Sequence, residues 1–184
     1  MRTIFAIILL FGMTTISGAQ GKKNFYDFKA TTIDGQPVDL STYKGKKVLV
    51  VNTASKCGYT PQYAQLEELY KTYGNERFVI IGFPANNFMG QEPGTNNEIK
   101  EFCTDKYHVT FPMMSKISVK GKEMDPLYKW LTDKELNGVM DASVKWNFQK
   151  FMIDENGNLA GMSPPGESPD SDRIVTWIKT GKVN

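Results

Sequence analysis

The chain of 184 residues is short of cysteine and histidine, and it has no large excess of charge of either sign. Its two cysteines are too few for a four-thiolate zinc site or a disulfide-rich small domain, and its single histidine, His108, excludes a multi-histidine metal site. Lys and Arg number 22 against 20 Asp and Glu, so the concentrated basic surface typical of nucleic-acid binding is not expected. The two thiols leave room for one disulfide or one redox pair, and the sequence predicts neither a metal nor a cofactor.

The rest of the composition is that of one compact domain. Hydrophobic residues make up 40% of the chain and aromatic residues 12%, which is ample for a core, and the formal net charge is only +2. No repeat, low-complexity tract or long Ser/Gly-rich linker divides the sequence. We therefore expect a single domain over residues 20–184.

The first nineteen residues have the pattern of a secretory signal peptide. Arg2 precedes an apolar run over residues 4–11, and the small residues Ser17 and Ala19 follow at the spacing of a cleavage site. The alternative is a membrane anchor, but the run is well short of the roughly 20 residues that a spanning helix needs. We expect cleavage after Ala19, no stable membrane anchor, and a periplasmic or secreted protein.

Two long apolar segments with a helix between them predict an α/β fold. Residues 47–52 and 77–83 are nearly continuous apolar runs rich in β-branched residues, as expected for strands that are covered on both faces. Between them a helix is expected to start at Thr60-Pro61, with Thr60 as its cap and Pro61 in the first helical position. This order is a βαβ unit with a parallel pair of strands.

Turn and cap residues indicate the other elements. Asp34-Gly35 and Asn156-Gly157 are turn pairs that predict hairpins on either side of them. Further helices are expected to begin at three cap signals, which are the capping box of Thr95 and Glu98, Asp125-Pro126 and Ser168-Pro169. Together these elements predict a central mixed sheet flanked by helices, with an N-terminal hairpin. The neighbouring Glu67 and Glu68 are expected to form a solvated face of the first helix.

Cys57 is the residue best placed for chemistry. It lies between a buried strand and a helix start, where α/β folds carry their reactive groups. The free N–H groups of a helix N-terminus and the adjacent Lys56 favour a thiolate, which is the nucleophilic form. The alternative interpretation is a small buried side chain or one end of a structural disulfide.

Cys103 lies on the apolar face of the helix predicted after Thr95, next to Phe102. A free cysteine in that place packs as a small hydrophobic residue. A disulfide with Cys57 needs Cα atoms within about 7 Å of each other, which a rigid helix need not permit. The helix is rather polar, so it is a candidate for local opening.

Four segments resemble the signatures of the glutathione peroxidase family and occur in the family's order. They are residues 52–62 (NTASKCGYTPQ), 82–94 (GFPANNFMGQEPG), 109–113 (VTFPM) and 145–151 (KWNFQKF). The resemblance implies a thioredoxin-like fold and the reduction of hydroperoxides by Cys57, in the cysteine version of the family.

The resemblance also implies a catalytic tetrad. Trp146 and Asn147 match the family's pair that hydrogen-bonds to the reactive sulfur, and both side chains are donors that favour a thiolate. The remaining family member is a glutamine, whose position we assign to Asn87, one methylene shorter. The sequence leaves open whether Gln91 supplies the missing reach.

Cys103 occurs where thioredoxin-dependent members of the family keep their resolving cysteine. The implied cycle forms a sulfenic acid on Cys57, which Cys103 converts to a disulfide that an external dithiol protein reduces. A thioredoxin-like protein is favoured over glutathione as the reductant. No insertion resembles the family's oligomerisation loop, so a monomer is expected. Residues 162–165 (MSPP) depart from the Arg-Tyr segment common in the family, which weakens any inference about glutathione or lipid specificity.

Two other functions compete with a thiol peroxidase. One is a thiol-disulfide oxidoreductase or redox relay on the same fold, although its usual Cys-x-x-Cys pair is absent because position 60 is threonine. The other is a non-catalytic module in which Cys57 and Cys103 form a permanent disulfide. The preferred hydroperoxide is not indicated by the sequence.

Overall fold

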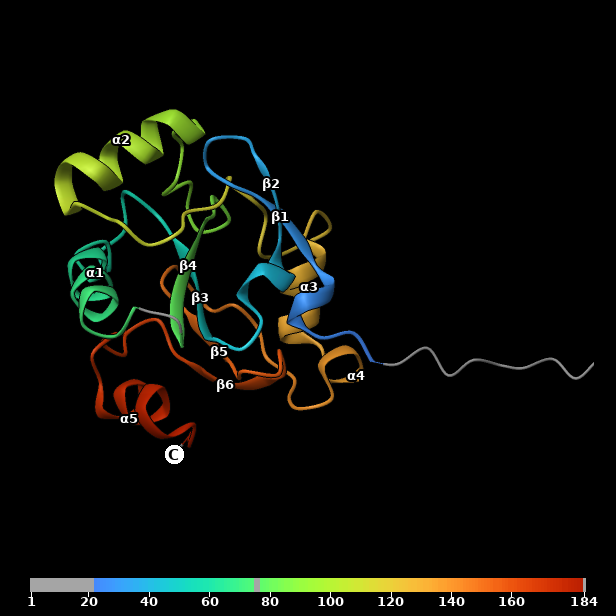
Figure 1. Ribbon diagram of the computed structural model, residues 1–184. Helices are drawn as coiled ribbons and strands as arrows, with labels where there is room; N and C mark the ends of the chain where they lie inside the picture. The colour runs from blue at the N-terminus through green and yellow to red at the C-terminus, as the bar shows by residue number, and fades with distance from the viewer. Residues whose placement is uncertain (1–21, 75–76, 184) are drawn as a thin grey trace, which may run out of the picture.

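A four-stranded sheet forms the centre of the molecule in the computed structural model, which describes residues 22–74 and 77–183 (Figure 1). The strand order is β4-β3-β5-β6. Strand β3 (Lys47–Thr53) pairs in parallel with β4 (Phe78–Pro84) and antiparallel with β5 (Lys150–Ile153), which pairs antiparallel with β6 (Leu159–Ser163). The predicted mixed sheet and its βαβ unit are confirmed.

The other elements flank this sheet. A separate N-terminal hairpin consists of β1 (Lys29–Thr31) and β2 (Pro37–Asp39), joined at Gly35 with a φ of 81°. The helices are α1 (Gln62–Tyr73), α2 (Asn96–Tyr107), α3 (Pro126–Thr132), α4 (Lys134–Asn137) and α5 (Asp172–Thr180), with 3-10 turns at η1 (Phe25–Asp27) and η2 (Leu40–Tyr43). Both hairpins and four of the five helices correspond to predicted elements, and the short α4 was not predicted.

The sheet has a hydrophobic cluster on each face. Alternate residues of β3 point to opposite sides, so Val48 and Val50 contribute to one cluster and Leu49 and Val51 to the other. Helices α1, α2 and α5 pack on the second side, while α3 and the N-terminal segment pack on the first (Figure 1). All seven residues of β3 and of β4 are buried, which explains why these strands are apolar almost throughout.

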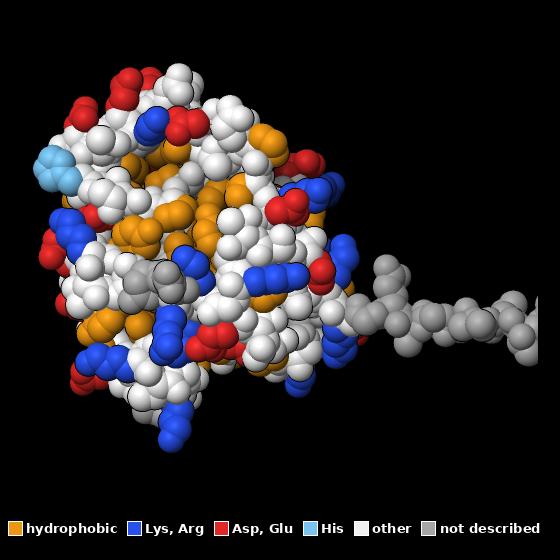
Figure 2. All heavy atoms as spheres, viewed as in Figure 1, with side chains coloured by type: hydrophobic (Ala, Val, Ile, Leu, Met, Phe, Trp, Pro, Cys, Tyr) orange, Lys and Arg blue, Asp and Glu red, His pale blue; other side chains and the backbone are white. Residues whose placement is uncertain are grey.

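Helix α2 lies above the carboxyl end of the parallel strands (Figure 1). Its capping box is formed as predicted, because Thr95 accepts from the Glu98 N–H and Glu98 accepts from the Thr95 N–H. Only Ile99 and Cys103 of its twelve residues are buried. In the same view as Figure 1, hydrophobic side chains surface in a hollow below α2, and charges of both signs are interspersed over the rest of this face (Figure 2).

Two helix starts differ from prediction. Helix α1 begins at Gln62 with Pro61 as its N-cap residue, so Thr60 is not a helix cap. Its hydroxyl instead bonds within the preceding loop, as described below. Helix α5 begins after Ser171, whose hydroxyl accepts from the Ile174 N–H, rather than after Ser168. At α1 the predicted cap hydroxyl is used within the loop, and at α5 a later serine supplies the cap.

Glu67 is a second correction, because its side chain is buried and not part of a solvated face. Its carboxylate accepts from the Thr110 N–H at 2.8 Å and from the Thr110 hydroxyl at 2.7 Å. These bonds join α1 to the segment after α2. Burial of a carboxylate is tolerated here because both of its oxygens have partners.

We expect Thr110→Val to lower the free energy of unfolding by about 1–3 kcal/mol, because it removes the hydroxyl donor to the buried Glu67 carboxylate. Urea unfolding followed by circular dichroism measures the change. Thr104→Val, at an exposed position of α2, is the matched control and should change stability by less than about 0.5 kcal/mol. Equal stabilities of the two variants would contradict the expectation.

The predicted signal peptide lies outside the described residues. Among residues 22–74 and 77–183, no helix is both long enough and apolar enough to cross a membrane.

Candidate active site

Cys57 is held in the connection between β3 and α1 by a small hydrogen-bonded loop. The Thr60 hydroxyl accepts from the Cys57 N–H and donates to the Ala54 carbonyl, both at 2.9 Å, and the Thr60 N–H donates to the Cys57 carbonyl at 3.0 Å. One threonine side chain therefore closes the loop on both sides of the cysteine. This is why Thr60 does not cap the helix.

The sulfur of Cys57 faces a backbone donor. The Tyr59 N–H points to Sγ at 3.4 Å, and the residue is only 8% exposed. A backbone N–H aimed at a sulfur stabilises the thiolate relative to the thiol. The loop thus supplies Cys57 with a backbone hydrogen-bond donor at its sulfur.

A second loop, which follows β4, is tied to the first. The Lys56 N–H donates to the Gln91 carbonyl at 3.0 Å, which joins the residue before Cys57 to the loop that carries Gln91. The Gln91 side chain accepts from the Asn147 amide at 3.0 Å. Because Gln91 accepts through its oxygen, its own N–H₂ group remains a donor.

The third part of the site comes directly before β5. Asn147 is fully buried, and its Oδ1 atom has no hydrogen-bond partner among the residues that the structure describes. The half-buried Trp146 packs against Phe88 with its ring tilted by 43° and the ring centroids 5.3 Å apart. The side-chain amide of Asn52 in β3 donates to the Trp146 carbonyl at 3.1 Å, and the backbone carbonyl of Asn52 accepts from the Phe148 N–H. Asn52, which sequence reasoning did not single out, therefore positions this turn.

A proline-rich loop after β6 borders the Cys57 loop. The Pro165 carbonyl accepts from the Gln62 amide at 2.8 Å and from the Lys150 ammonium at 3.2 Å. Lys150 is fully buried, and burial lowers its pKa to about 7, against the opposing effect of Glu167. Gly166 lies against the Tyr59 hydroxyl, so a β-carbon there would approach that oxygen to 3.1 Å. Pro165 and Gly166 thus lie against Gln62 and Tyr59, which follow Cys57 in the chain.

Cys103 lies in a different environment from Cys57. Both cysteines are free, and both belong to the hydrophobic cluster on the α1 side of the sheet. Burial raises the pKa of Cys103 to about 11. The Tyr63 hydroxyl is its neighbour, and rings of Tyr63, Phe102 and Tyr107 pack together beside it. At neutral pH this thiol is protonated.

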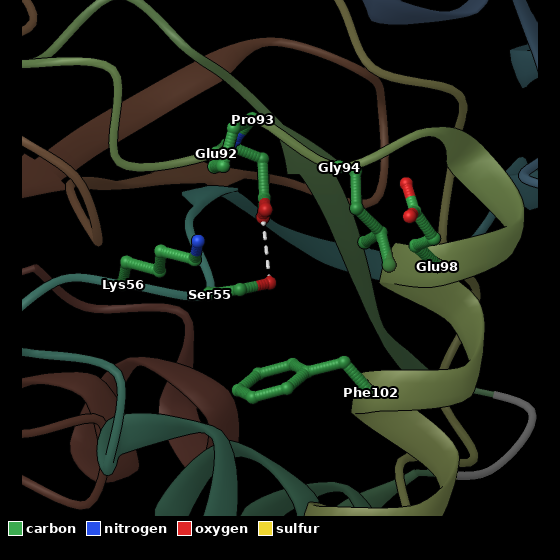
Figure 3. Close-up of a pocket in the computed structure, with 8 residues that line it drawn as sticks. Ser55, Lys56, Glu92, Pro93, Gly94, Glu98 and Phe102 are labelled. Atoms are coloured by element: carbon green, nitrogen blue, oxygen red, sulfur yellow. Dashed lines mark hydrogen bonds between the residues drawn. The ribbon is translucent and has the colours of Figure 1, made fainter.

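Cavities lie on both sides of α2. One, of about 310 Å³, is lined by Ser55, Lys56, Glu92 and Phe102 among others, and it separates the Cys57 loop from α2 (Figure 3). The other, of about 400 Å³, is lined by Cys103 itself and opens between α2 and the β1–β2 turn. Helix α2 thus has cavities on two sides and only two buried residues.

No group of three or more His, Cys, Asp or Glu side chains that could bind a metal occurs in the described part of the chain.

The family model for glutathione peroxidase matches residues 25–132. The chain belongs to the glutathione peroxidase family. It is 51% identical over 147 residues to a glutathione peroxidase of Lactococcus lactis, covering 80% of this chain and 93% of the relative. It is 48% identical over 136 residues to the glutathione peroxidase-like peroxiredoxin 2 of Saccharomyces cerevisiae, covering 74% of this chain and 84% of the relative.

Similarity to solved structures identifies the fold. The crystal structure of Trgpx in its apo form is 41% identical and superposes with a TM-score of 0.67, covering 86% of this chain and 97% of that one. A thiol:disulfide interchange protein of the thioredoxin family from Chlorobium tepidum has a TM-score of 0.55 at 23% identity, covering 85% and 96%. The predicted thioredoxin-like fold is confirmed.

Membership of the glutathione peroxidase family makes the position of the tetrad glutamine a question that the structure can address. Both the nitrogen and the oxygen of the Asn87 side-chain amide form hydrogen bonds with residues 118–120. The nitrogen donates to the Ser118 hydroxyl and the Lys120 carbonyl, and the oxygen accepts from the Val119 N–H. Asn87 therefore holds a neighbouring loop, and the structure does not place it with Asn147. Gln91 has that contact instead. The assignment of Asn87 to the tetrad stays a prediction, with Gln91 as the other candidate.

We expect Gln91→Ala to slow the reaction of Cys57 with hydrogen peroxide by about tenfold or more, because it removes a donor and the Asn147 partner from the site. Stopped-flow measurement of the oxidation rate of the reduced protein tests this. Asn87→Ala is the matched control and should change the rate by less than about threefold. A larger loss in Asn87→Ala than in Gln91→Ala would identify Asn87 as the tetrad residue.

Proposed function

We propose that this protein is a thiol peroxidase that reduces hydrogen peroxide and organic hydroperoxides through Cys57. The observation that carries the proposal is the hydrogen-bonded loop around Cys57, with the Tyr59 N–H on its sulfur and the Gln91–Asn147 pair joined to it through Lys56. Relatives with such names as glutathione peroxidase and peroxiredoxin support the same reaction class.

In the first step, the Cys57 thiolate attacks the terminal oxygen of the hydroperoxide. The O–O bond breaks, the sulfur is oxidised to a sulfenic acid, and the leaving oxygen takes a proton to depart as water or an alcohol. Amide and indole donors from Gln91, Trp146 and Asn147 are the groups suited to stabilise the charge that moves onto the leaving oxygen. The low exposure of Cys57 limits access to a narrow approach.

In the second step, Cys103 attacks the sulfenic acid and forms a disulfide with Cys57, releasing water. The two sulfurs lie on separate elements, so α2 must open for them to meet. Two observations favour such opening: only two residues of α2 are buried, and cavities lie on both sides of it. A permanent structural disulfide finds no support, since both thiols are free.

A thioredoxin-like dithiol protein is the proposed reductant of this disulfide, with glutathione as the alternative. We further propose that residues 1–19 direct export, that residues 20–184 are the mature domain, and that the protein acts as a monomer without a stable membrane anchor, in the periplasm or outside the cell. The pattern of residues 2–19 supports the export proposal.

A steady-state assay tests the function. Purified residues 20–184 are given hydrogen peroxide, a short alkyl hydroperoxide or a fatty acid hydroperoxide, together with either a thioredoxin system or glutathione. We expect hydroperoxide consumption that is faster with thioredoxin than with glutathione. Consumption no faster than with the reductants alone would contradict the proposed function, and reduction of an oxidised protein substrate in its place would indicate the oxidoreductase alternative.

A further inference from the structure

Lys150 is a buried basic residue that the reaction steps above do not use. It lies in β5 opposite Val51 of β3, and its side chain is fully buried. Alternation along β5 places it on the same side of the sheet as Met152, which belongs to the hydrophobic cluster that also contains Cys57. A lysine is rarely fully buried unless its nitrogen has partners there. The partners of Lys150 therefore indicate what it does.

The Nζ atom of Lys150 holds the loop between β6 and α5. It donates to the Pro165 carbonyl at 3.2 Å and also to the Glu167 carbonyl. Pro164 and Pro165 have no backbone N–H, so this loop has few donors of its own for its carbonyl groups. Lys150 supplies two donors to the loop from the sheet.

The side chain of Glu167 is the charged group that faces Lys150. Its carboxylate accepts from the Ser163 hydroxyl at 2.9 Å and from the Ser171 hydroxyl at 2.7 Å, and it lies 3.8 Å from the guanidinium of Arg173. The carboxylate thus has partners within the loop and α5. The hydrogen bonds of Lys150 itself go to backbone oxygens, so they fix the path of the loop.

The same loop contacts the connection between β3 and α1. The Pro165 carbonyl accepts from the Gln62 side chain at 2.8 Å as well, and the Gln62 N–H donates to the Tyr59 carbonyl at 2.9 Å. Gly166 lies so near the Tyr59 hydroxyl that a β-carbon on this glycine would approach it to 3.1 Å. The loop therefore bears on Tyr59 in two ways, through Gln62 and directly at its ring.

We propose that Lys150 is a positioning residue for the reaction of Cys57 with hydroperoxides, because the loop that it holds keeps the Tyr59 N–H directed at the Cys57 sulfur. That N–H is the donor 3.4 Å from Sγ. This inference rests on the proposed peroxidase function and extends the site to a residue outside the Cys57 loop. When the loop is released, Tyr59 is free to turn away, and a sulfur that has lost its donor is ionised less readily.

Burial of Lys150 does not by itself favour the folded state. Burial lowers the pKa of the lysine to about 7, against the opposing charge of Glu167, so the folded protein binds this proton less tightly than the unfolded chain does. Methionine is apolar and of similar length, so Lys150→Met removes this penalty together with the two hydrogen bonds. The two effects oppose each other, and we expect the variant to melt within a few degrees of the unmodified protein.

Lys150→Met tests the proposal through the chemistry of Cys57. The reduced protein is treated with hydrogen peroxide or with iodoacetamide, and mass spectrometry follows the modification of Cys57. At pH 7 we expect both reactions to slow by about tenfold, because a smaller fraction of the sulfur is ionised. With iodoacetamide at pH 10 the loss should shrink to less than about twofold, because the sulfur is then largely ionised in both proteins.

Lys47→Met is the matched control. Lys47 is also a buried lysine whose Nζ donates to a backbone carbonyl, that of Ile178 at 2.8 Å, but it lies at the start of β3 and not at the end that leads to Cys57. This variant should react within about twofold of the unmodified protein at every pH. An equal fractional loss at every pH in Lys150→Met would overturn the proposal, as would a rate at pH 7 within about twofold of the unmodified protein.

Gln62→Leu covers the case in which Lys150→Met does not fold. It removes the other donor to the Pro165 carbonyl, so it should slow the alkylation of Cys57 at pH 7 by about threefold or more. In the double variant the loss should be smaller than the product of the two single losses, because both changes act through one carbonyl. Unchanged alkylation in a folded Gln62→Leu protein would contradict the proposal, and so would a double loss equal to the product.

Alkylation requires no hydroperoxide, so this inference and the proposed function can fail separately. If the unmodified protein does not react with hydroperoxides, the proposed function is wrong. Equal alkylation of Lys150→Met and the unmodified protein at pH 7 would contradict the role of Lys150 alone.

Discussion

Replacement of Cys57 by serine is expected to reduce hydroperoxide consumption to the background rate with every reductant. A serine hydroxyl at this position stays protonated near neutral pH and is a far weaker nucleophile than a thiolate, and it has no sulfenic acid state. The loop should survive the change, because the bonds that close it run from the backbone of Cys57 to Thr60 and from Thr60 to Ala54. The loss is therefore one of chemistry and not of folding.

The measurement is steady-state consumption of hydrogen peroxide with a thioredoxin system, beside a thermal melt of the same preparation. Cys57→Ser should melt within a few degrees of the unmodified protein and should still contain one thiol, Cys103, that titrates after unfolding. Substantial peroxidase activity in this variant would exclude Cys57 as the nucleophile and with it the proposed function.

Replacement of Cys103 by serine is expected to separate the first oxidation from turnover. The variant should react with one equivalent of hydrogen peroxide at nearly the unmodified rate, since Cys103 lies on α2 and outside the Cys57 loop. Turnover with the thioredoxin system should then fall to background, because no disulfide is available for a dithiol protein to reduce. The sulfenic acid on Cys57 should accumulate and react with dimedone.

Cys103→Ala is the control for packing, since both variants remove the thiol but only serine introduces a buried hydroxyl at this site. Both should lose thioredoxin-dependent turnover equally, whatever their melting temperatures. Retained turnover in both variants would show that another group resolves the sulfenic acid. A large loss of melting temperature, together with no free thiols in the unmodified native protein, would indicate a structural disulfide instead.

The contrast between the two cysteines explains why both predictions are large. Cys57 has a backbone N–H on its sulfur and lies in a rigid loop, while Cys103 is packed among aromatic rings with a pKa raised to about 11 by burial. One thiol is prepared to attack, and the other is protected until α2 opens. In a peroxidase that held both thiols ionised, the peroxide would react at either sulfur.

Local signals in the sequence were sufficient for most of the elements. The run of β-branched residues in β3, the capping box of Thr95 and Glu98 and the Asn156-Gly157 turn act over a few residues, so they predict structure without knowledge of the rest of the chain. The predicted helix start at Thr60 was wrong because its hydroxyl can either cap the helix or form hydrogen bonds within the preceding loop. The bonds to Cys57 and Ala54 replaced the cap, and this choice depends on how the loop closes.

The sequence by itself determined the mixed α/β architecture, the place of Cys57 after a buried strand, and the resemblance to the glutathione peroxidase family. Only the tertiary structure decided that Gln91 and not Asn87 bonds to Asn147, and that Glu92 faces the cavity beside α2. The physical reason is the separation along the sequence of the residues that determine each feature. Helices and strands follow from the order of nearby side chains, whereas the direction of a polar side chain in a loop is set by partners that lie 31 to 56 residues away in the sequence.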